Sequence, residues 1–170
     1  MLYDPAGCQY FKAITRGSGV FAYSGGGWAP AWTPVILDLN GDGRSDVFLY
    51  SKESGLWYRC LSIGDGTVGF TYTGDGWTPE WSLQVADFDA DSRSDLLLYN
   101  AASGVWYEAI NSGAGFSYFT GGWSRQWETT AADLNGDGRS DVFLYSDASR
   151  VWYQAFTTGV GSFAYTSGMF

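Results

Sequence analysis

Thirteen residues, DLNGDGRSDVFLY, occur twice without change in this chain of 170 residues, at 38–50 and at 133–145. A related copy, DFDADSRSDLLLY, occupies 87–99. The copies follow one another at steps of 49 and 46 residues. A chain with self-similarity at such a period is constrained to fold as an array of equivalent units, because each unit buries its apolar faces against its neighbours.

Other features recur at matching places within each unit. The Leu-Tyr pairs begin at 2, 49, 98 and 144, and an aromatic doublet follows each of them, beginning at 10, 57, 106 and 152. Phe-x-Tyr triplets begin at 21, 70, 116 and 163. Two tryptophans four residues apart come next, as Trp28/Trp32, Trp77/Trp81 and Trp123/Trp127. The repeat therefore covers the whole chain, with an incomplete unit at 2–32 and complete units at 33–77, 82–123 and 128–170.

Each complete unit is predicted to contain four short strands. The first leads into the acidic stretch, at Val35–Leu37, Gln84–Ala86 and Thr130–Ala132. The second leaves it as a nearly continuous apolar run, at Val47–Tyr50, Leu96–Tyr99 and Val142–Tyr145, which is typical of strands buried on both faces. The third strand carries the aromatic doublet and the fourth carries the Phe-x-Tyr triplet. Turns are expected at 52–55, 64–67, 101–104 and 111–115.

The pattern predicts an all-β fold, a β-propeller of four-stranded blades, with a β-sandwich of irregular hairpins as the alternative. The first unit lacks an acidic stretch and a first strand. The chain therefore amounts to about 3.75 blades, a partial propeller domain over 1–170. We expect self-association, as a homodimer, to complete a ring of seven or eight blades. The alternative is that the chain is a fragment of a longer propeller.

The acidic stretches place oxygen-bearing side chains at the first, third, fifth and ninth positions of a short loop. These ligands, with a backbone carbonyl at position seven, suit Ca²⁺. An EF-hand is excluded, because it needs flanking helices and a glutamate at position twelve, where leucine stands. Ala90 and Ser92 replace glycines in the middle loop, which predicts weaker binding or a strained bend. The candidate ligands, including the arginines for their carbonyls, are Asp38, Asn40, Asp42, Arg44, Asp46, Asp87, Asp89, Asp91, Arg93, Asp95, Asp133, Asn135, Asp137, Arg139 and Asp141.

The pattern D-x-N-x-D-G-x-x-D followed by an apolar strand, once per unit, resembles the FG-GAP or VCBS repeat of integrin-like β-propellers. The resemblance implies that each loop binds one structural Ca²⁺ at the base of a blade, about three ions per chain. It also favours an extracellular or cell-surface location. Empty loops would crowd like charges, so folding is expected to depend on calcium by mass action.

Each tryptophan pair lies between the last predicted strand of one unit and the first strand of the next. One tryptophan of a pair can fill the gap between blades. The other interpretation is a sugar platform, because the C–H face of a pyranose ring stacks on indole and repeated weak sites add avidity on a glycan surface. The candidate sugar-binding residues are Trp28, Trp32, Trp77, Trp81, Trp123 and Trp127.

The tryptophan-rich units are similar to the PVL-type seven-bladed lectins. That similarity implies binding of N-acetylglucosamine-like or fucose-like sugars between blades. The third pair departs from the other two, because Arg125 stands where Pro30 and Pro79 stand. A protein-interaction scaffold of the integrin kind, bound through loops and ring faces, is the alternative function.

Composition disfavours several other functions. The net charge of −9 disfavours nucleic-acid binding, which needs a basic surface. The sequence has no apolar run of 18 residues, so membrane insertion is not expected. It has no histidine, so nucleophile–histidine pairs and histidine-bound metal sites are excluded, and we expect no enzyme. Cys8 and Cys60 permit a disulfide without requiring one.

Overall fold

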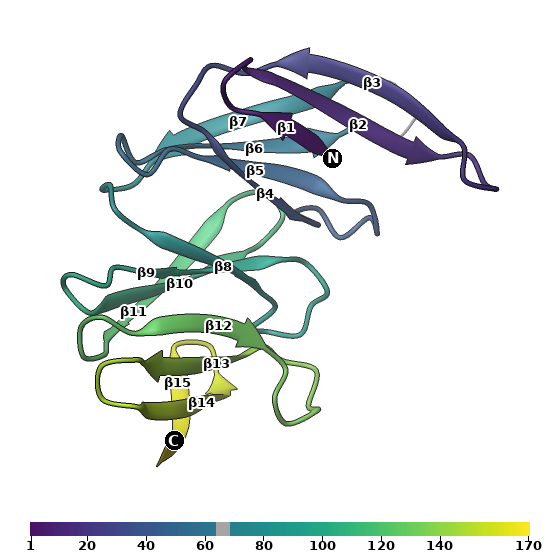
Figure 1. Ribbon diagram of the computed structural model, residues 1–170. Coiled ribbons are helices and arrows are strands. Elements are labelled where there is room, and N and C mark those ends of the chain that lie inside the picture. Colours follow the sequence, from purple (N-terminus) through teal and green to yellow (C-terminus); the bar gives the residue numbers. More distant parts are fainter. Residues whose placement is uncertain (64–68) are drawn as a thin grey trace. The chain divides into compact units, whose positions relative to one another are not determined.

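The computed structural model describes residues 1–63 and 69–170, and the regular elements in these ranges are all β-strands (Figure 1). They divide into two compact units, one of Met1–Asp38 and Asp42–Pro79, the other of Leu39–Gly41 and Glu80–Phe170. The turn predicted at 64–67 lies outside the described residues. Within those ranges, no helix is long and apolar enough to cross a membrane.

The first unit contains two antiparallel sheets whose strands follow chain order. Sheet 1 has three strands, β1 (Leu2–Asp4), β2 (Gln9–Thr15) and β3 (Phe21–Gly27). Sheet 2 has four, β4 (Thr33–Leu37), β5 (Asp46–Tyr50), β6 (Leu56–Ser62) and β7 (Phe70–Gly76). The short β1 pairs with Gln9–Phe11 of β2.

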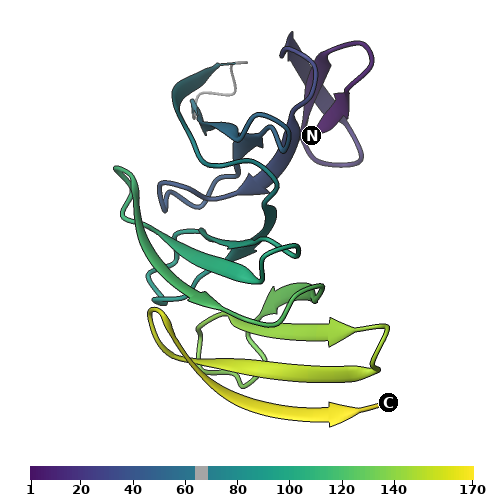
Figure 2. The same ribbon diagram turned by 90° about the vertical axis from the view of Figure 1, so that its left-hand side faces the viewer.

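The second unit contains two four-stranded antiparallel sheets. Sheet 3 consists of β8 (Ser82–Ala86), β9 (Asp95–Tyr99), β10 (Val105–Asn111) and β11 (Phe116–Gly122). Sheet 4 consists of β12 (Glu128–Ala132), β13 (Asp141–Ser146), β14 (Val151–Gly159) and β15 (Ser162–Met169). Figure 2 shows sheet 4 with β15, in yellow, at its edge. The prediction of an all-β chain built from four-stranded antiparallel blades, about 3.75 of them, is confirmed.

The second strand of sheets 2 and 3 is buried because it is apolar on both faces, and the second strand of sheet 4, β13, is buried in part. All five residues of β5 and all five of β9 are buried. Successive side chains of a strand point to opposite faces, so these residues supply both faces of their sheets. This explains why the apolar runs after the acidic stretches do not alternate with polar residues.

Each unit has its own core between its two sheets. In the first unit, buried residues from both sheets form one cluster: Tyr10, Trp28, Val47, Leu49, Cys60 and Phe70. In the second unit the cluster joins sheet 3 to sheet 4 and contains Ala86, Phe88, Leu97, Tyr99, Trp106, Ile110, Val142, Leu144 and Ala155. Cys60 belongs to the first core and, like Cys8, is a free thiol.

Two glycine turns hold the chain close to the tryptophan segments. Gly55 and Gly104 adopt φ of 76° and 82°. The N–H groups of Trp77 and Trp123 donate to the carbonyls of Gly55 and Gly104, at 2.9 and 2.8 Å. A Cβ atom on Gly104 would lie 2.2 Å from the carbonyl oxygen of Trp123. Only glycine therefore fits, for reasons of both conformation and space.

A carboxylic acid is buried inside the second core. Glu108 of β10 is fully buried, and its Oε2 accepts a hydrogen bond from the N–H of Gly161 at 2.6 Å, whereas its Oε1 has no hydrogen-bond partner. Burial raises the pKa of Glu108 to about 7. The neutral Gln154 occupies the same position in sheet 4, directly after a Trp-Tyr doublet.

We predict that Glu108→Gln removes part of the pH dependence of stability. The pKa of Glu108 is about 7 in the folded state and near 4.5 when unfolded, so stability is highest below pH 4.5 and falls as pH rises to 7. The variant keeps an acceptor for the N–H of Gly161. At pH 8 its free energy of unfolding should be roughly 1–3 kcal/mol higher than that of the parent. Urea titrations at pH 5 and pH 8 measure this difference. The exposed Glu128→Gln is the control, and an equal profile for both variants would contradict the prediction.

Candidate functional site

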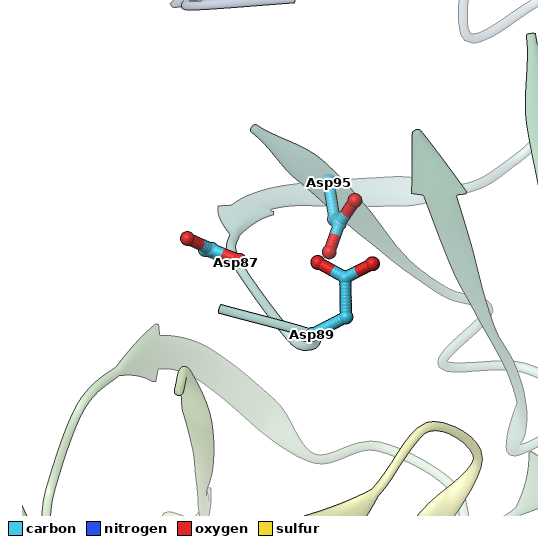
Figure 3. Close-up of side chains that lie close together, drawn as sticks. All are labelled: Asp87, Asp89 and Asp95. Atoms are coloured by element: carbon cyan, nitrogen blue, oxygen red, sulfur yellow. The ribbon is translucent and has the colours of Figure 1, made fainter. Parts of the chain in front are cut away.

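Three carboxylates converge in the middle acidic loop (87–95), which joins β8 to β9. Asp87, Asp89 and Asp95 each have an oxygen within 4.8 Å of an oxygen of the other two. Figure 3 shows the carboxylates of Asp89 and Asp95 facing each other, with Asp87 at the start of the loop. In the described part of the chain, no other three side chains among Asp, Glu, Cys and His lie this close together. The sequence-based candidates thus meet most closely in the loop that departs from the glycine pattern.

The ninth residue of the middle loop is its buried anchor. One carboxylate oxygen of Asp95 accepts from the N–H of Phe88 at 2.8 Å, and the other accepts from the N–H of Asn111 at 2.7 Å. Asp95 has no exposed surface, and burial raises its pKa to about 7. Burial also raises the pKa of Asp89, with a further contribution from the neighbouring Asp91. A cation placed among these carboxylates would offset both effects.

The bend of the middle loop is strained. Ala90 and Ser92 have φ of 61° and 66°, in the left-handed region that residues with a Cβ atom rarely adopt. The glycines at the same positions of the last acidic loop (133–141), Gly136 and Gly138, have φ of 80° and 85°. The middle loop therefore keeps the backbone bend of its relatives at a conformational cost.

The acids at position five of the first two loops contact the arginines at position seven. The guanidinium group of Arg93 pairs with Asp91, and that of Arg44 pairs with Asp42 at 2.5 Å. Asp91 is not part of the cluster that Asp87, Asp89 and Asp95 form. The sequence analysis expected the carbonyl oxygens of these arginines as ligands, and that stays a prediction. In the structure, their side chains pair with a neighbouring carboxylate.

The last acidic loop is closed by hydrogen bonds from its own backbone. Asp133 accepts from the N–H groups of Gly136 and Gly138, at 2.7 and 3.0 Å, and these bonds lower the pKa of Asp133. Asn135 donates to Asp137 at 3.1 Å. The buried Asp141 accepts from Leu134 at 3.0 Å and from Thr157 at 2.8 Å. Its ninth residue thus makes the same two connections as Asp95.

The first acidic loop (38–46) divides between the two units: Asp38 and 42–46 belong to the first unit, and Leu39–Gly41 belongs to the second. Asp38 accepts from the N–H of Gly43 at 2.8 Å, which resembles the start of the last loop. The buried Asp46 accepts from the N–H of Ser62 at 2.8 Å. Asn40 is exposed and lies in the segment that belongs to the second unit.

The chemistry of the donor set fits a hard divalent cation. The carboxylates of Asp87, Asp89 and Asp95 offer the oxygen ligands that Ca²⁺ takes, in a loop whose backbone is bent around them. The hydrogen bonds to Asp95 leave a lone pair on each of its oxygens.

In the first and third pairs, the first tryptophan donates a hydrogen bond to a tyrosine of the following sheet. The indole N–H of Trp28 donates to the hydroxyl of Tyr72 at 3.2 Å, and that of Trp123 donates to Tyr165 at 2.9 Å. Trp28 is buried and stacks on Tyr10 at 4.1 Å between ring centres. These tryptophans fill space between two sheets of one unit, as one of the two sequence-based interpretations expected.

The second tryptophan of each pair lies edge-on to a tyrosine of the next aromatic doublet. Ring centres are 5.4 Å apart for Trp32 and Tyr58 and for Trp81 and Tyr107, and 5.5 Å apart for Trp127 and Tyr153. The interplanar angles are 75°, 84° and 86°, so the geometry repeats. Trp81 is buried, whereas Trp32, Trp77, Trp123 and Trp127 are half-buried.

An open pocket of about 320 Å³ lies beside the third pair, between sheet 3 and sheet 4. Its aromatic lining comes from both tryptophans of the pair and from two tyrosines of sheet 4. The residues that line it are Gly122, Trp123, Ser124, Trp127, Leu144, Tyr153 and Tyr165. The pocket therefore combines ring faces with the polar groups of Ser124 and Tyr165.

Tyr99 fixes the loop that carries this pocket. Its hydroxyl donates to the carbonyl of Ser124 at 2.8 Å and accepts from the N–H of Trp127 at 3.3 Å. Gln126, between these two residues, has φ of 65°. Ala31 and Glu80 have φ of 72° and 74° at the same position of the other pairs. A strained turn thus presents the second tryptophan in all three repeats.

Sequence reasoning missed the tyrosines of the pocket as site residues. Tyr153 and Tyr165 belong to the aromatic doublet and to the Phe-x-Tyr triplet, which were used only as markers of strands. The signal that could have found them is the order of the motifs: an aromatic doublet begins 29 residues after the first tryptophan of each pair, and a Phe-x-Tyr triplet follows it in every repeat.

We predict opposite effects of glycine at strained and unstrained positions. Ala90→Gly and Ser92→Gly should each raise the free energy of unfolding by about 0.5 kcal/mol, because relief of the left-handed strain exceeds the added chain entropy. Gly136→Ala should lower it by about 1 kcal/mol. Chemical denaturation in the presence of chelator measures all three. Ala102→Gly, in an exposed turn without a positive φ, is the control and should destabilise. A loss of stability in Ala90→Gly equal to that of the control would contradict the assignment of strain.

Comparison with known proteins supports the repeat and the fold. Residues 38–98 match the model of the FG-GAP-like repeat family, which confirms the resemblance for that segment. No relative matches among curated proteins. The structure is similar to that of an Agrocybe aegerita lectin described as specifically recognising non-reducing terminal N-acetylglucosamine, with a TM-score of 0.71 and 18% identity over 92% of this chain. The chain spans 45% of that lectin's length. Residues 38–98 are thus an FG-GAP-like segment within a chain of β-propeller fold.

Proposed function

We propose that this chain is a carbohydrate-binding protein whose β-propeller blades are stabilised by calcium. The observation that carries the proposal is the open aromatic pocket formed by Trp123, Trp127, Tyr153 and Tyr165. The fold shared with a lectin supports it. The ligand class is a mono- or oligosaccharide with one pyranose face free to stack.

The pocket has the two kinds of surface that a sugar needs. The rings of Trp123 and Trp127 offer apolar faces for the C–H groups of a pyranose. Ser124 and the hydroxyl of Tyr165 offer hydrogen bonds to sugar hydroxyls, since a tyrosine hydroxyl that accepts from an indole N–H can still donate. Its volume of about 320 Å³ is at the small end of ligand pockets, which favours a single sugar ring.

Equivalent groups recur in the first unit. Trp28 contacts Tyr72 and Trp32 contacts Tyr58, as Trp123 contacts Tyr165 and Trp127 contacts Tyr153. Repetition of a weak site would raise avidity on a surface that displays many glycans. We propose a non-enzymatic role, because ten of the eighteen acidic side chains lie in the loops that we propose as cation sites and the pocket is lined by aromatic and small residues.

Calcium is proposed for the acidic loops, with the middle loop as the best supported site. Asp87, Asp89 and Asp95 would hold the ion there, joined by the carbonyl of Arg93 and by Asp91 after release of its arginine partner. The ion would neutralise the crowded carboxylates and stiffen the loop between two strands. Asp38, Asn40, Asp42, Arg44 and Asp46 would serve the first loop, and Asp133, Asn135, Asp137, Arg139 and Asp141 the last.

We predict that Trp127→Ala lowers the affinity for the bound glycan at least tenfold, a loss of about 1.4 kcal/mol, because the stacking face is removed. Trp127→Tyr, which keeps a ring, should retain most of the affinity. A glycan array followed by calorimetry with the selected sugar measures both, and circular dichroism verifies that the variants fold. Absence of glycan binding by the folded, calcium-loaded protein would reject the lectin function and favour the protein-interaction scaffold.

We predict that calcium raises the thermal midpoint of unfolding and that Asp89→Asn reduces this rise. At a free ion concentration of 1,000 times the dissociation constant, a single site stabilises by about 4 kcal/mol. Without calcium, the variant should be as stable as the parent or more so, because burial already disfavours the charge of Asp89. Calorimetric scans with calcium and with chelator measure both effects. Asp147→Asn, an exposed acid outside the loops, is the control. Equal calcium responses in the two variants would contradict the site.

A further inference from the structure

Hydrogen bonds join the middle acidic loop of sheet 3 to the last acidic loop of sheet 4. The N–H of Ser140 donates to the carbonyl of Asp87 at 2.7 Å, and the N–H of Asp87 donates to the hydroxyl of Ser140 at 2.8 Å. The guanidinium group of Arg139 donates to the carbonyl of Phe88 at 2.9 Å. The seventh and eighth residues of the last loop thus hold the first two residues of the middle loop.

Two peptide groups form a continuous line between the loops. The carbonyl of Arg139 and the N–H of Ser140 belong to one peptide group. That N–H bonds to the carbonyl of Asp87, whose peptide group includes the N–H of Phe88. The N–H of Phe88 donates in turn to the buried carboxylate of Asp95 at 2.8 Å. A line of hydrogen bonds therefore leads from a proposed ligand of the last loop to a proposed ligand of the middle loop.

Ser140 is also fixed to its own sheet. Its carbonyl accepts from the hydroxyl of Thr157 in β14 at 2.6 Å, and the N–H of Thr157 donates to the adjoining Asp141 at 2.8 Å. Thr157 and Phe88 are both buried, so water competes little for the bonds around them. The contact between the loops is therefore anchored in sheet 4 on one side and in sheet 3 on the other.

The two residues of the last loop that make this contact belong to a repeated pattern. A serine stands at position eight of every acidic loop, as Ser45, Ser94 and Ser140, directly after the arginine at position seven. Neither side chain adds a negative charge to a cation site. In the last loop, both side chains instead bond to the backbone of the preceding acidic loop.

We infer that Ser140 and Arg139 are positioning residues for the cation site of the middle loop, and that the middle and last loops therefore bind their cations cooperatively. The peptide group of Arg139 and Ser140 becomes more polarised when its carbonyl binds a cation, so its N–H donates more strongly to Asp87. The next peptide group then donates more strongly to Asp95, which stabilises the carboxylate that a cation in the middle loop requires. The inference rests on the proposed cation sites and not on carbohydrate binding.

The charges of the two loops favour positive coupling. The middle loop carries four aspartates and one arginine, and the last loop carries three aspartates and one arginine. A divalent cation in each loop therefore changes the net charges from −3 and −2 to −1 and 0. Neither filled loop is positively charged, so repulsion between the loops does not cancel the effect of the hydrogen bonds. The coupling is reciprocal, because each site must change the affinity of the other by the same factor.

Calcium titrations of the full chain, followed by nuclear magnetic resonance, test the coupling. The amide signals of Ala90 and Gly136 report on the middle and the last loop separately. Asp137→Asn removes a charge from the last loop but keeps an oxygen that accepts from the N–H of Arg139. It should raise the calcium midpoint read at Ala90 about fivefold, although the middle loop is unchanged. Ser140→Ala should reduce this shift to about twofold or less, and Ser140→Thr, which keeps the hydroxyl, should restore it.

The exposed Ser45, at the same position of the first loop, provides the control, and Ser45→Ala should leave the shift at Ala90 unchanged. A merely structural Ser140 would lower stability in chelator without altering the shift that Asp137→Asn produces. That result, an unchanged midpoint at Ala90 in Asp137→Asn, or a shift to lower calcium, would overturn the inference. A folded chain in which no amide signal responds to calcium would instead reject the proposed cation sites, and the coupling with them.

Thermal unfolding with calcium and with chelator gives a second measurement. Asp89→Asn weakens the cation site of the middle loop, and Asp137→Asn weakens that of the last loop. With positive coupling, the losses of calcium-dependent stability in the two single variants should sum to more than the loss in the double variant. The losses should become additive when Ser140→Ala is present in every variant. Additive losses with Ser140 intact would contradict the coupling.

Discussion

A buried aspartate at the ninth position of each acidic loop holds the complete blades together. Asp95 and Asp141 each accept one hydrogen bond from the second residue of their own loop and one from the third strand of their sheet. Asp46 bonds to the third strand of its sheet in the same way. A buried carboxylate is costly unless its oxygens are satisfied, so these bonds couple loop closure to sheet formation.

The strain in the loops follows from this arrangement. The loop must turn back so that its second residue reaches its ninth, and left-handed backbone conformations provide the bend. Where glycine is absent, at Ala90 and Ser92, the bend persists because the buried anchor fixes both ends. In the same loop, three carboxylates come closest together. Their mutual repulsion disfavours the loop without an ion, and the same crowding of negative charge favours a bound cation.

The junction between sheets is the second organising feature. The segment that follows sheet 3 carries Trp123 and Trp127, and these two rings contact Tyr165 and Tyr153 of sheet 4. The same junction therefore supplies core packing and an open aromatic surface, and Trp123 and Trp127 take part in both. Core and candidate binding site share residues, which is why the first tryptophan of a pair cannot be assigned to one role only.

The sequence by itself determined the repeat, the all-β blades and the acidic and tryptophan motifs, because these depend on local spacing and on the period of two in a strand. It left open which loop gathers its carboxylates and which tyrosines complete the pocket. Those outcomes were decided by tertiary structure: Tyr153 and Tyr165 reach Trp127 and Trp123 only when two sheets pack face to face. Contacts across separate strands depend on side-chain packing, which local spacing does not encode.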